Sequence, residues 1–243
     1  MELKRFFVEN NIINNQIVLT DVEHNHLSNV LRLRVGDNVI CVVGDGYDYE
    51  CEIVSIDKKS STLKVLSKIE NIYDPKVNIT VYQGVIKGDN MPLITQKLNE
   101  IGVTKLVPFT SKYTVALGSK NLVGKLQATS NQSVKQCNRS KPMIVSDIRD
   151  IKDIPNDFGS YDKVLLCYEK ESATMQSLEN ALVKANNIAI IVGSEGGFSN
   201  EEVDYLVSKG ATSISMGNRI LRAETACISI SSVVAYIAGE WNR

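Results

Sequence analysis

Two glycine-containing loops are the segments of this sequence best suited to hold a ligand. The first reads Gly193-Ser194-Glu195-Gly196-Gly197-Phe198, and the second reads Met216-Gly217-Asn218-Arg219-Ile220-Leu221-Arg222-Ala223-Glu224-Thr225-Ala226. Glycines permit positive φ and a close approach to the backbone, and each loop leads into an expected helix whose first amides are unpaired. We therefore expect a ligand site made largely of backbone groups. The alternative is two tight connections without a ligand.

Several familiar chemistries lack their motifs. The chain has no Gly-x-Gly-x-x-Gly after the first strand of its strand-helix region, no P-loop and no Gly-x-Ser-x-Gly. His24 and His26 lie two apart on an expected helix and point to different faces, so we interpret them as surface or capping residues and not as ligands of a shared metal. Five widely spaced cysteines argue against disulfides and structural zinc. A glycine-rich loop without phosphate-binding residues suits a cofactor that has no phosphates, such as S-adenosylmethionine.

Both loops must be positioned by the second part of the chain, where strands and helices alternate. Residues 164–168, 188–192 and 213–216 are expected strands; Ser199 and Glu202 form a capping box that opens one helix, and the last helix covers about 224–239. This rhythm predicts a mostly parallel sheet with helices on both faces. In such sheets ligands bind at the carboxyl ends of the strands, which is where both loops begin.

The first seventy residues show a different rhythm. Short strands are expected at residues 6–8, 17–19, 39–43, 47–56 and 62–69, with one helix from Asp21, its expected N-cap, to about Leu33. This pattern predicts a small barrel or curled sheet. Residues 71–75 resemble a linker, so we expect a small domain over 1–72 and an α/β domain over 73–243.

The charge is unevenly distributed although the 243 residues carry a formal net charge of only −1. Residues 76–152 hold 12 Lys or Arg against 4 Asp or Glu, which indicates either a nucleic-acid face or a solvated helix with scattered lysines. Apolar runs are far shorter than the roughly 18 residues of a membrane span, and the N-terminus lacks a signal-peptide pattern. We expect a cytoplasmic protein with no membrane partner.

Several motifs together resemble one known family over nearly the whole chain. The opening Arg5-Phe6-Phe7, the Lys87-Gly88-Asp89 segment, the Gln136-Cys137 pair with Arg139, and above all the two glycine loops are similar to the RsmE family of 16S ribosomal RNA uridine-N3 methyltransferases, which belongs to the SPOUT superfamily. Ser194 stands where that family usually has proline, and Met216 stands where it usually has leucine.

The resemblance implies a fold, a cofactor and partners. The implied fold is a small PUA-like β-barrel for RNA followed by a SPOUT-type parallel sheet whose C-terminal part forms a trefoil knot. S-adenosylmethionine is the implied methyl donor, with S-adenosylhomocysteine as product and no metal. The implied partners are 16S rRNA, within the small ribosomal subunit, and a second copy of the chain.

Residue roles are expected as follows. Arg222 is our first choice for stabilising negative charge on the uracil oxygens, with an ion pair to Glu224 or Glu195 as the alternative. Glu195 is assigned to the catalytic site, with a cofactor-loop role preferred over that of a base and helix capping as the alternative. The expected cofactor contacts are Leu166, Gly193, Glu195, Gly196, Gly197, Met216, Gly217, Ile220, Leu221 and Ala223. The expected RNA contacts, any of which has simple exposure as its alternative, are Arg5, Arg32, Arg34, Lys135, Arg139 and Lys141.

Two other functions remain open from the sequence. A non-catalytic RNA-binding or ribosome-assembly factor would keep the same pocket without the reaction. A SPOUT methyltransferase acting on tRNA would share the second domain but would not account for the N-terminal match. The target nucleotide and the group that removes the N3 proton are left open.

Overall fold

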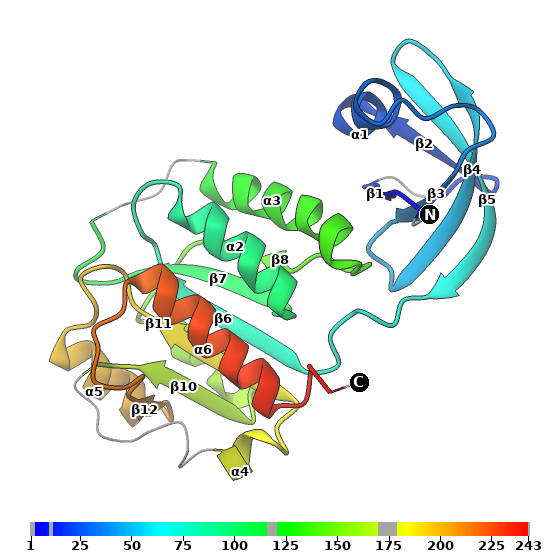
Figure 1. Cartoon of the computed structure of the whole chain (residues 1–243). Coiled ribbons are helices and arrows are strands. Elements are labelled where there is room, and N and C mark those ends of the chain that lie inside the picture. The colour runs from blue at the N-terminus through cyan, green and yellow to red at the C-terminus, as the bar shows by residue number, and fades with distance from the viewer. Residues whose placement is uncertain (1–2, 10–11, 116–120, 170–178, 243) are drawn as a thin grey trace. The chain divides into compact units, whose positions relative to one another are not determined.

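The computed structural model describes residues 3–9, 12–115, 121–169 and 179–242 of the chain (Figure 1). The chain folds into two compact units. The first comprises Met1–Asp74 with Asn131–Pro142, and the second comprises Pro75–Ser130 with Met143–Arg243. Helix α3 (Leu122–Cys137) therefore contributes its first half to the second unit and its second half to the first.

The first unit is a curled five-stranded sheet with one short helical segment. Its strand order is β1-β3-β4-β5-β2; β1 runs parallel to β3, and the other pairs are antiparallel. The strands are β1 (Arg5–Phe7), β2 (Gln16–Thr20), β3 (Asn38–Val42), β4 (Tyr47–Ile56) and β5 (Ser60–Glu70). On β4, Tyr49, Cys51 and Ile53 are buried at alternate positions, as the sequence pattern predicts for a half-buried strand.

The prediction of one continuous α-helix from Asp21 to Leu33 is wrong. Helix α1 covers only Asp21–Asn25, and a π-helix follows over His26–Val30, in which the Leu31 N–H donates to the carbonyl five residues earlier at 2.9 Å. The N-cap is Thr20, and it makes no side-chain capping bond. The wider turn of a π-helix shifts the phase of the following side chains, so a stripe read at 3.6 residues per turn no longer shares one face.

The buried side chains of this segment differ from the expected apolar stripe both before and within the π-helix. Leu27 is fully buried, whereas Val22 and Val30, both expected in the apolar stripe, are exposed. His24, expected at the surface, is buried, and its Nδ1 is hydrogen-bonded to Ser61 Oγ at 2.8 Å.

The second unit contains a parallel sheet of seven strands. Its order is β12-β10-β11-β6-β7-β8, with β9 also paired to β7. The strands are β6 (Asn78–Gly84), β7 (Lys105–Thr110), β8 (Ile144–Val145), β9 (Arg149–Asp150), β10 (Lys163–Cys167), β11 (Asn187–Val192) and β12 (Thr212–Ile214). The remaining helices are α2 (Asn90–Ile101), a 3-10 helix (Ile154–Ser160), α4 (Glu179–Leu182), α5 (Asn200–Ser208) and α6 (Ala223–Ile237).

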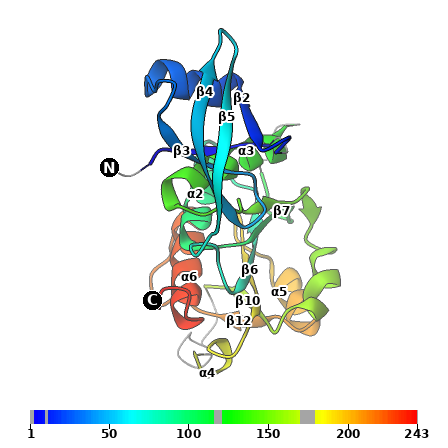
Figure 2. The same ribbon diagram turned by 90° about the vertical axis from the view of Figure 1, so that its right-hand side faces the viewer.

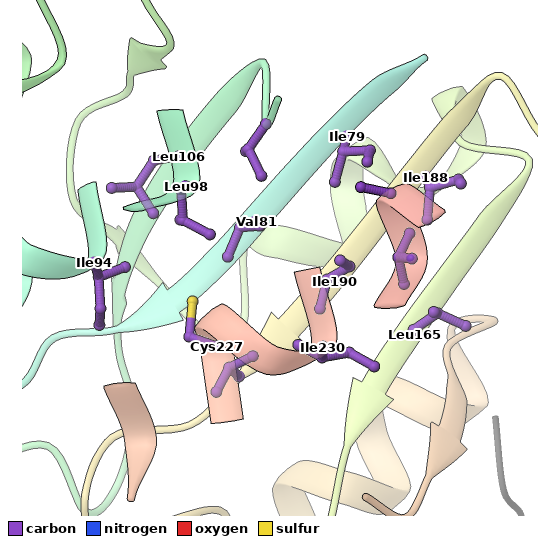
Figure 3. Close-up of a cluster of buried hydrophobic side chains, with 14 of the residues drawn as sticks. Ile79, Val81, Ile94, Leu98, Leu106, Leu165, Ile188, Ile190, Cys227 and Ile230 are labelled. Atoms are coloured by element: carbon purple, nitrogen blue, oxygen red, sulfur yellow. The ribbon is translucent and has the colours of Figure 1, made fainter. Parts of the chain in front are cut away.

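Separate apolar clusters cover the two faces of this sheet. Figure 3 shows side chains of β6, β10 and β11 packed against Ile94 and Leu98 of α2 and against Cys227 and Ile230 of α6. On the other face Phe158, Val203 and Leu206 belong to a second cluster, and Figure 2 shows α5 and α6 on opposite sides of the strands. Each fully buried aliphatic side chain contributes roughly 1.5–3 kcal/mol of transfer free energy. The two-faced α/β sheet predicted from the alternating rhythm is confirmed.

Local signals set the helix boundaries near the ligand loops. Ser199 is the N-cap of α5, its Oγ accepts from the Glu202 N–H, and Glu202 accepts from the Ser199 N–H, so the expected capping box is confirmed. Helix α6 begins at Ala223 with Arg222 as N-cap. None of the helices that the structure describes is long and apolar enough to cross a membrane.

Candidate functional site

A cavity of about 550 Å³ lies at the carboxyl ends of β10, β11 and β12. Three loops form its walls: residues 167–169 after β10, residues 193–198 after β11 and residues 216–222 after β12. All of its lining residues belong to the second unit. The two glycine loops of the sequence therefore meet at one site, at the sheet edge where parallel strands place their ligands.

The first glycine loop is folded tightly against β6. The Gly197 N–H donates to the Ser194 carbonyl at 2.9 Å, and Gly197 has a φ of +65°, which favours glycine. A Cβ on Gly84, the last residue of β6, would lie 2.4 Å from the Ser194 backbone nitrogen. Because a Cβ at residue 84 would clash with backbone atoms of the loop, the loop can hold this position only with glycine at residue 84.

Gln83 holds the same loop from behind, and the sequence did not single it out. Its side chain is fully buried at the end of β6, and its Nε2 donates to the carbonyls of Gly193 at 3.0 Å and of Gly84 at 2.9 Å. The bond to Gly193 joins the ends of β6 and β11, whereas the buried Oε1 of Gln83 has no partner among the described residues. A glutamine directly before a glycine at the carboxyl end of an expected strand is the signal that could have identified it.

Glu195 connects the glycine loop to the segment after β6. The Lys87 N–H donates to its Oε1 at 2.8 Å. One carboxylate oxygen is thus used to hold the Lys87-Gly88-Asp89 segment. This geometry favours the loop-holding role over that of a base.

The second loop presents a free cation to the cavity. Gly217 has a φ of +98°, and a Cβ there would meet nothing within 4 Å, so the backbone is open on the cavity side. Arg222 lies at the start of α6 and lines the cavity. In the described part of the chain it makes no ion pair, neither with Glu224 nor with Glu195, so the alternative role as a structural ion pair is not seen.

Most of the expected cofactor contacts line the cavity. They are Gly193, Glu195, Gly196, Gly197, Met216, Gly217, Ile220, Leu221 and Ala223. Leu166 is not among them, because it is fully buried in the cluster on the α5 face, while its neighbour Cys167 lines the cavity. Adjacent residues of a strand point to opposite faces, and this alternation corrects the choice by one position.

The structure adds lining residues that were not among the expected cofactor contacts, although two of them belong to the glycine loops. They include Asn90, Cys167, Tyr168, Glu169, Ser194 and Arg219. Three of these lie at or just after the end of β10, the sheet neighbour of β11, so the missing signal was the strand order. Burial raises the pKa of the Cys167 thiol to about 12, so the thiol stays protonated and is a poor nucleophile.

The expected RNA contacts fall into two groups in the first unit. Arg5 forms an ion pair with Asp48 at 2.7 Å, and Lys135 forms one with Glu23 at 2.8 Å. Arg139 is 3% exposed. The exposed ones are Arg32, Arg34 and Lys141. Of the six expected contacts, only these three exposed residues present their charge freely to solvent.

Comparison with known proteins identifies the family. A family described as an RNA methyltransferase domain matches residues 73–235, and one described as an RNA methyltransferase PUA domain matches residues 19–66. Ribosomal RNA small subunit methyltransferase E of Mesomycoplasma hyopneumoniae is 30% identical, with 92% of this chain and 95% of that protein covered. The chain belongs to the ribosomal RNA small subunit methyltransferase E family.

Other members of the methyltransferase E family agree in length and fold. The Bacillus subtilis protein of the same name is 26% identical over 249 residues, covering 96% of each chain. A crystal structure of the Neisseria gonorrhoeae member, bound to S-adenosyl methionine, matches 97% of this chain with a TM-score of 0.88 and 24% identity. The expected architecture, a PUA-like domain followed by a parallel α/β sheet of an RNA methyltransferase domain, is confirmed.

Within the described residues no group of three or more His, Cys, Asp or Glu side chains is arranged to hold a metal ion.

Proposed function

We propose that this protein transfers a methyl group from S-adenosylmethionine to N3 of a uridine in 16S ribosomal RNA. The observation that carries the proposal is that both glycine loops meet in one cavity, beside an Arg222 that forms no ion pair with other described residues. Membership of the methyltransferase E family supports the reaction and the substrate class.

The residues of the cavity fit S-adenosylmethionine. Met216, Ile220 and Leu221 offer apolar surface for an adenine, and the glycine loops offer backbone groups. Arg219 lines the cavity without an ion pair to another described residue, which suits recognition of the cofactor's carboxylate. The Oγ of Ser194 is buried without a partner among the described residues, and a bound ligand could supply one.

When bound, S-adenosylmethionine supplies an activated methyl group for in-line displacement. The chain's own residues must then align the acceptor and manage the N3 proton. Uracil N3 lies on the Watson–Crick edge, so the base has to be unpaired or extruded before it enters the site. Arg222 is suited to stabilise negative charge on the uracil oxygens through two parallel N–H donors.

We assign RNA binding to residues 1–72 and methyl transfer to residues 73–243, except that Lys141 belongs to the segment 131–142 of the first unit and is counted with the RNA contacts. The exposed Arg32, Arg34 and Lys141 are suited to bind phosphates, which position RNA without reading its sequence. Small-subunit RNA as substrate also implies action in the cytoplasm.

We further infer a homodimer and a C-terminal trefoil knot. Both follow from the family resemblance. The dimer is supported by exposed apolar side chains near the C-terminal end of α6, namely Val233, Tyr236 and Trp241. Exposed apolar surface of this kind is typical of contact with a second chain.

Labelled methyl transfer tests the proposed function directly. Small ribosomal subunits, free 16S RNA and tRNA are each incubated with the protein and labelled S-adenosylmethionine, and primer extension locates the product. N3 methylation blocks base pairing, so we expect one new stop in 16S RNA. Incorporation into tRNA alone would favour a tRNA methyltransferase, and cofactor binding without any incorporation would favour a binding factor.

A further inference from the structure

The loop that follows β10 carries an acidic side chain whose role the glycine loops do not explain. Glu169 lies two residues beyond the end of β10 and lines the cavity. Strand β10 pairs in parallel with β11, with Leu166 opposite Ile191. The two neighbouring strands therefore deliver Glu169 and the first glycine loop to the same edge of the sheet.

Both carboxylate oxygens of Glu169 face this glycine loop. A Cβ built on Gly197 would lie 3.9 Å from Oε2 and 4.0 Å from Oε1, and apart from the neighbouring residues 196 and 198 no other described residue has a heavy atom within 4 Å. Both oxygens therefore lie about equally close to the loop. Because Gly197 has no side chain, the space between the loop and the carboxylate stays open.

Both carboxylate oxygens of Glu169 are without a partner among the residues that the structure describes. Within the described residues the carboxylate forms neither an ion pair nor a hydrogen bond. The other two acids of the cavity are differently placed. Glu195 already accepts a hydrogen bond from the Lys87 N–H. Glu224 lies in the first turn of α6, where its negative charge interacts favourably with the helix dipole.

We propose that Glu169 recognises the ribose of the bound cofactor, each carboxylate oxygen accepting a hydrogen bond from one of the 2′ and 3′ hydroxyls. This inference rests on the proposed function, because it takes the nucleoside of S-adenosylmethionine as the ligand. A vicinal diol presents two donors side by side, which match the two oxygens of one carboxylate. Parallel α/β sheets that bind dinucleotides elsewhere use a glycine loop after one strand and an acidic residue that binds the ribose, although there the acid follows the loop in the chain and here it precedes it.

Calorimetry with two ligands tests the assignment on the full-length protein. S-adenosylhomocysteine and its 2′-deoxyribose analogue are titrated into the wild type, Glu169→Ala and Glu169→Gln. We expect the wild type to bind S-adenosylhomocysteine about tenfold or more tightly than the analogue, as loss of a charge-assisted hydrogen bond predicts. Glu169→Ala should bind S-adenosylhomocysteine about tenfold or more weakly than the wild type and should no longer discriminate between the two ligands. Glu169→Gln, which keeps one acceptor oxygen, should lie between.

Glu201→Gln is the matched control, since Glu201 is an exposed acid of the same unit outside the cavity. It should bind both ligands as the wild type does, and thermal melting should show that all variants are folded. Undiminished discrimination in Glu169→Ala would overturn the proposal. So would a loss of affinity for S-adenosylhomocysteine without a loss for 5′-methylthioadenosine, because the carboxylate would then bind the amino-acid part. A wild type that binds none of these ligands would instead contradict the proposed function itself.

Discussion

Arg222 combines a structural position with a free functional group. Its backbone is the N-cap of α6, but its side chain makes no capping bond and no ion pair with other described residues. Replacing the side chain should therefore leave the helix intact and remove only the cation.

We expect Arg222→Ala to lower the methyl-transfer rate by about 100-fold or more, the usual effect of losing a donor to a developing oxyanion. Single-turnover transfer at saturating cofactor measures the rate, and calorimetry should show cofactor affinity within about threefold of the wild type. Arg222→Lys, which keeps the charge without the paired donors, should be intermediate. Unchanged turnover in Arg222→Ala would remove this residue from the reaction.

Gly196 is a second residue on which the shape of the cofactor site depends. A Cβ there would lie 2.6 Å from Tyr113 Cβ and 3.1 Å from the Tyr113 carbonyl oxygen. Gly196→Val should displace the loop and abolish cofactor binding in calorimetry. Gly159→Val is a suitable control, since a Cβ at residue 159 meets nothing within 4 Å. Equal affinity in Gly196→Val and the wild type would refute the placement of the cofactor against this loop.

At the scale of elements, α5 shows how local sequence sets the direction in which a glycine loop leaves the sheet. Its capping box links Ser199 and Glu202, and the second carboxylate oxygen, Oε1, accepts from the Lys112 N–H at 2.7 Å. The helix start and the segment after β7 are thus held by one glutamate.

Ser199→Ala should lower the free energy of unfolding by about 1 kcal/mol through loss of the cap. Urea unfolding followed by circular dichroism measures the change. Ser208→Ala, at the other end of α5, removes only a bond to the Tyr205 carbonyl at the exposed face and should have a smaller effect. An equal loss in both variants would show that capping is not what stabilises this helix.

The segment after β2 shows where local reading fails. Its sequence has helical periodicity, yet the structure changes from α-helix to π-helix at His26. A π-helical turn is locally less favourable than an α-helical turn, so tertiary packing has to offset its free-energy cost. Here Leu27 is fully buried in the core of the first unit. No local propensity signals that compensation.

At the scale of the whole molecule, the two units carry separable tasks. Every residue that lines the cavity belongs to the second unit, whereas the exposed Arg32, Arg34 and Lys141 belong to the first. Changes to these three cations should therefore affect RNA binding and leave the cofactor unaffected.

We expect a triple charge reversal of Arg32, Arg34 and Lys141 to weaken RNA binding and to reduce the slope of log K against log salt by about 2 to 3, since each phosphate contact contributes roughly 0.7–0.9. Filter binding over a salt series measures the slope. The matched control reverses Lys58, Lys59 and Lys64, exposed cations of the same unit. If both triple variants lost the same affinity, general charge and not these three positions would govern RNA binding.

The sequence by itself determined the alternation of strands and helices, the capping box at Ser199 and the two glycine loops, because each of these depends on residues within a few positions of one another. Only the tertiary structure decided that β10, β11 and β6 are neighbours. That order brings Gln83 to the carbonyl of Gly193, Lys87 to the carboxylate of Glu195 and Glu169 to the face of Gly197. The first two contacts join residues more than a hundred positions apart. Periodicity predicts which face of a strand is buried, but the order of strands depends on how whole faces pack, and it is this order that completes the site.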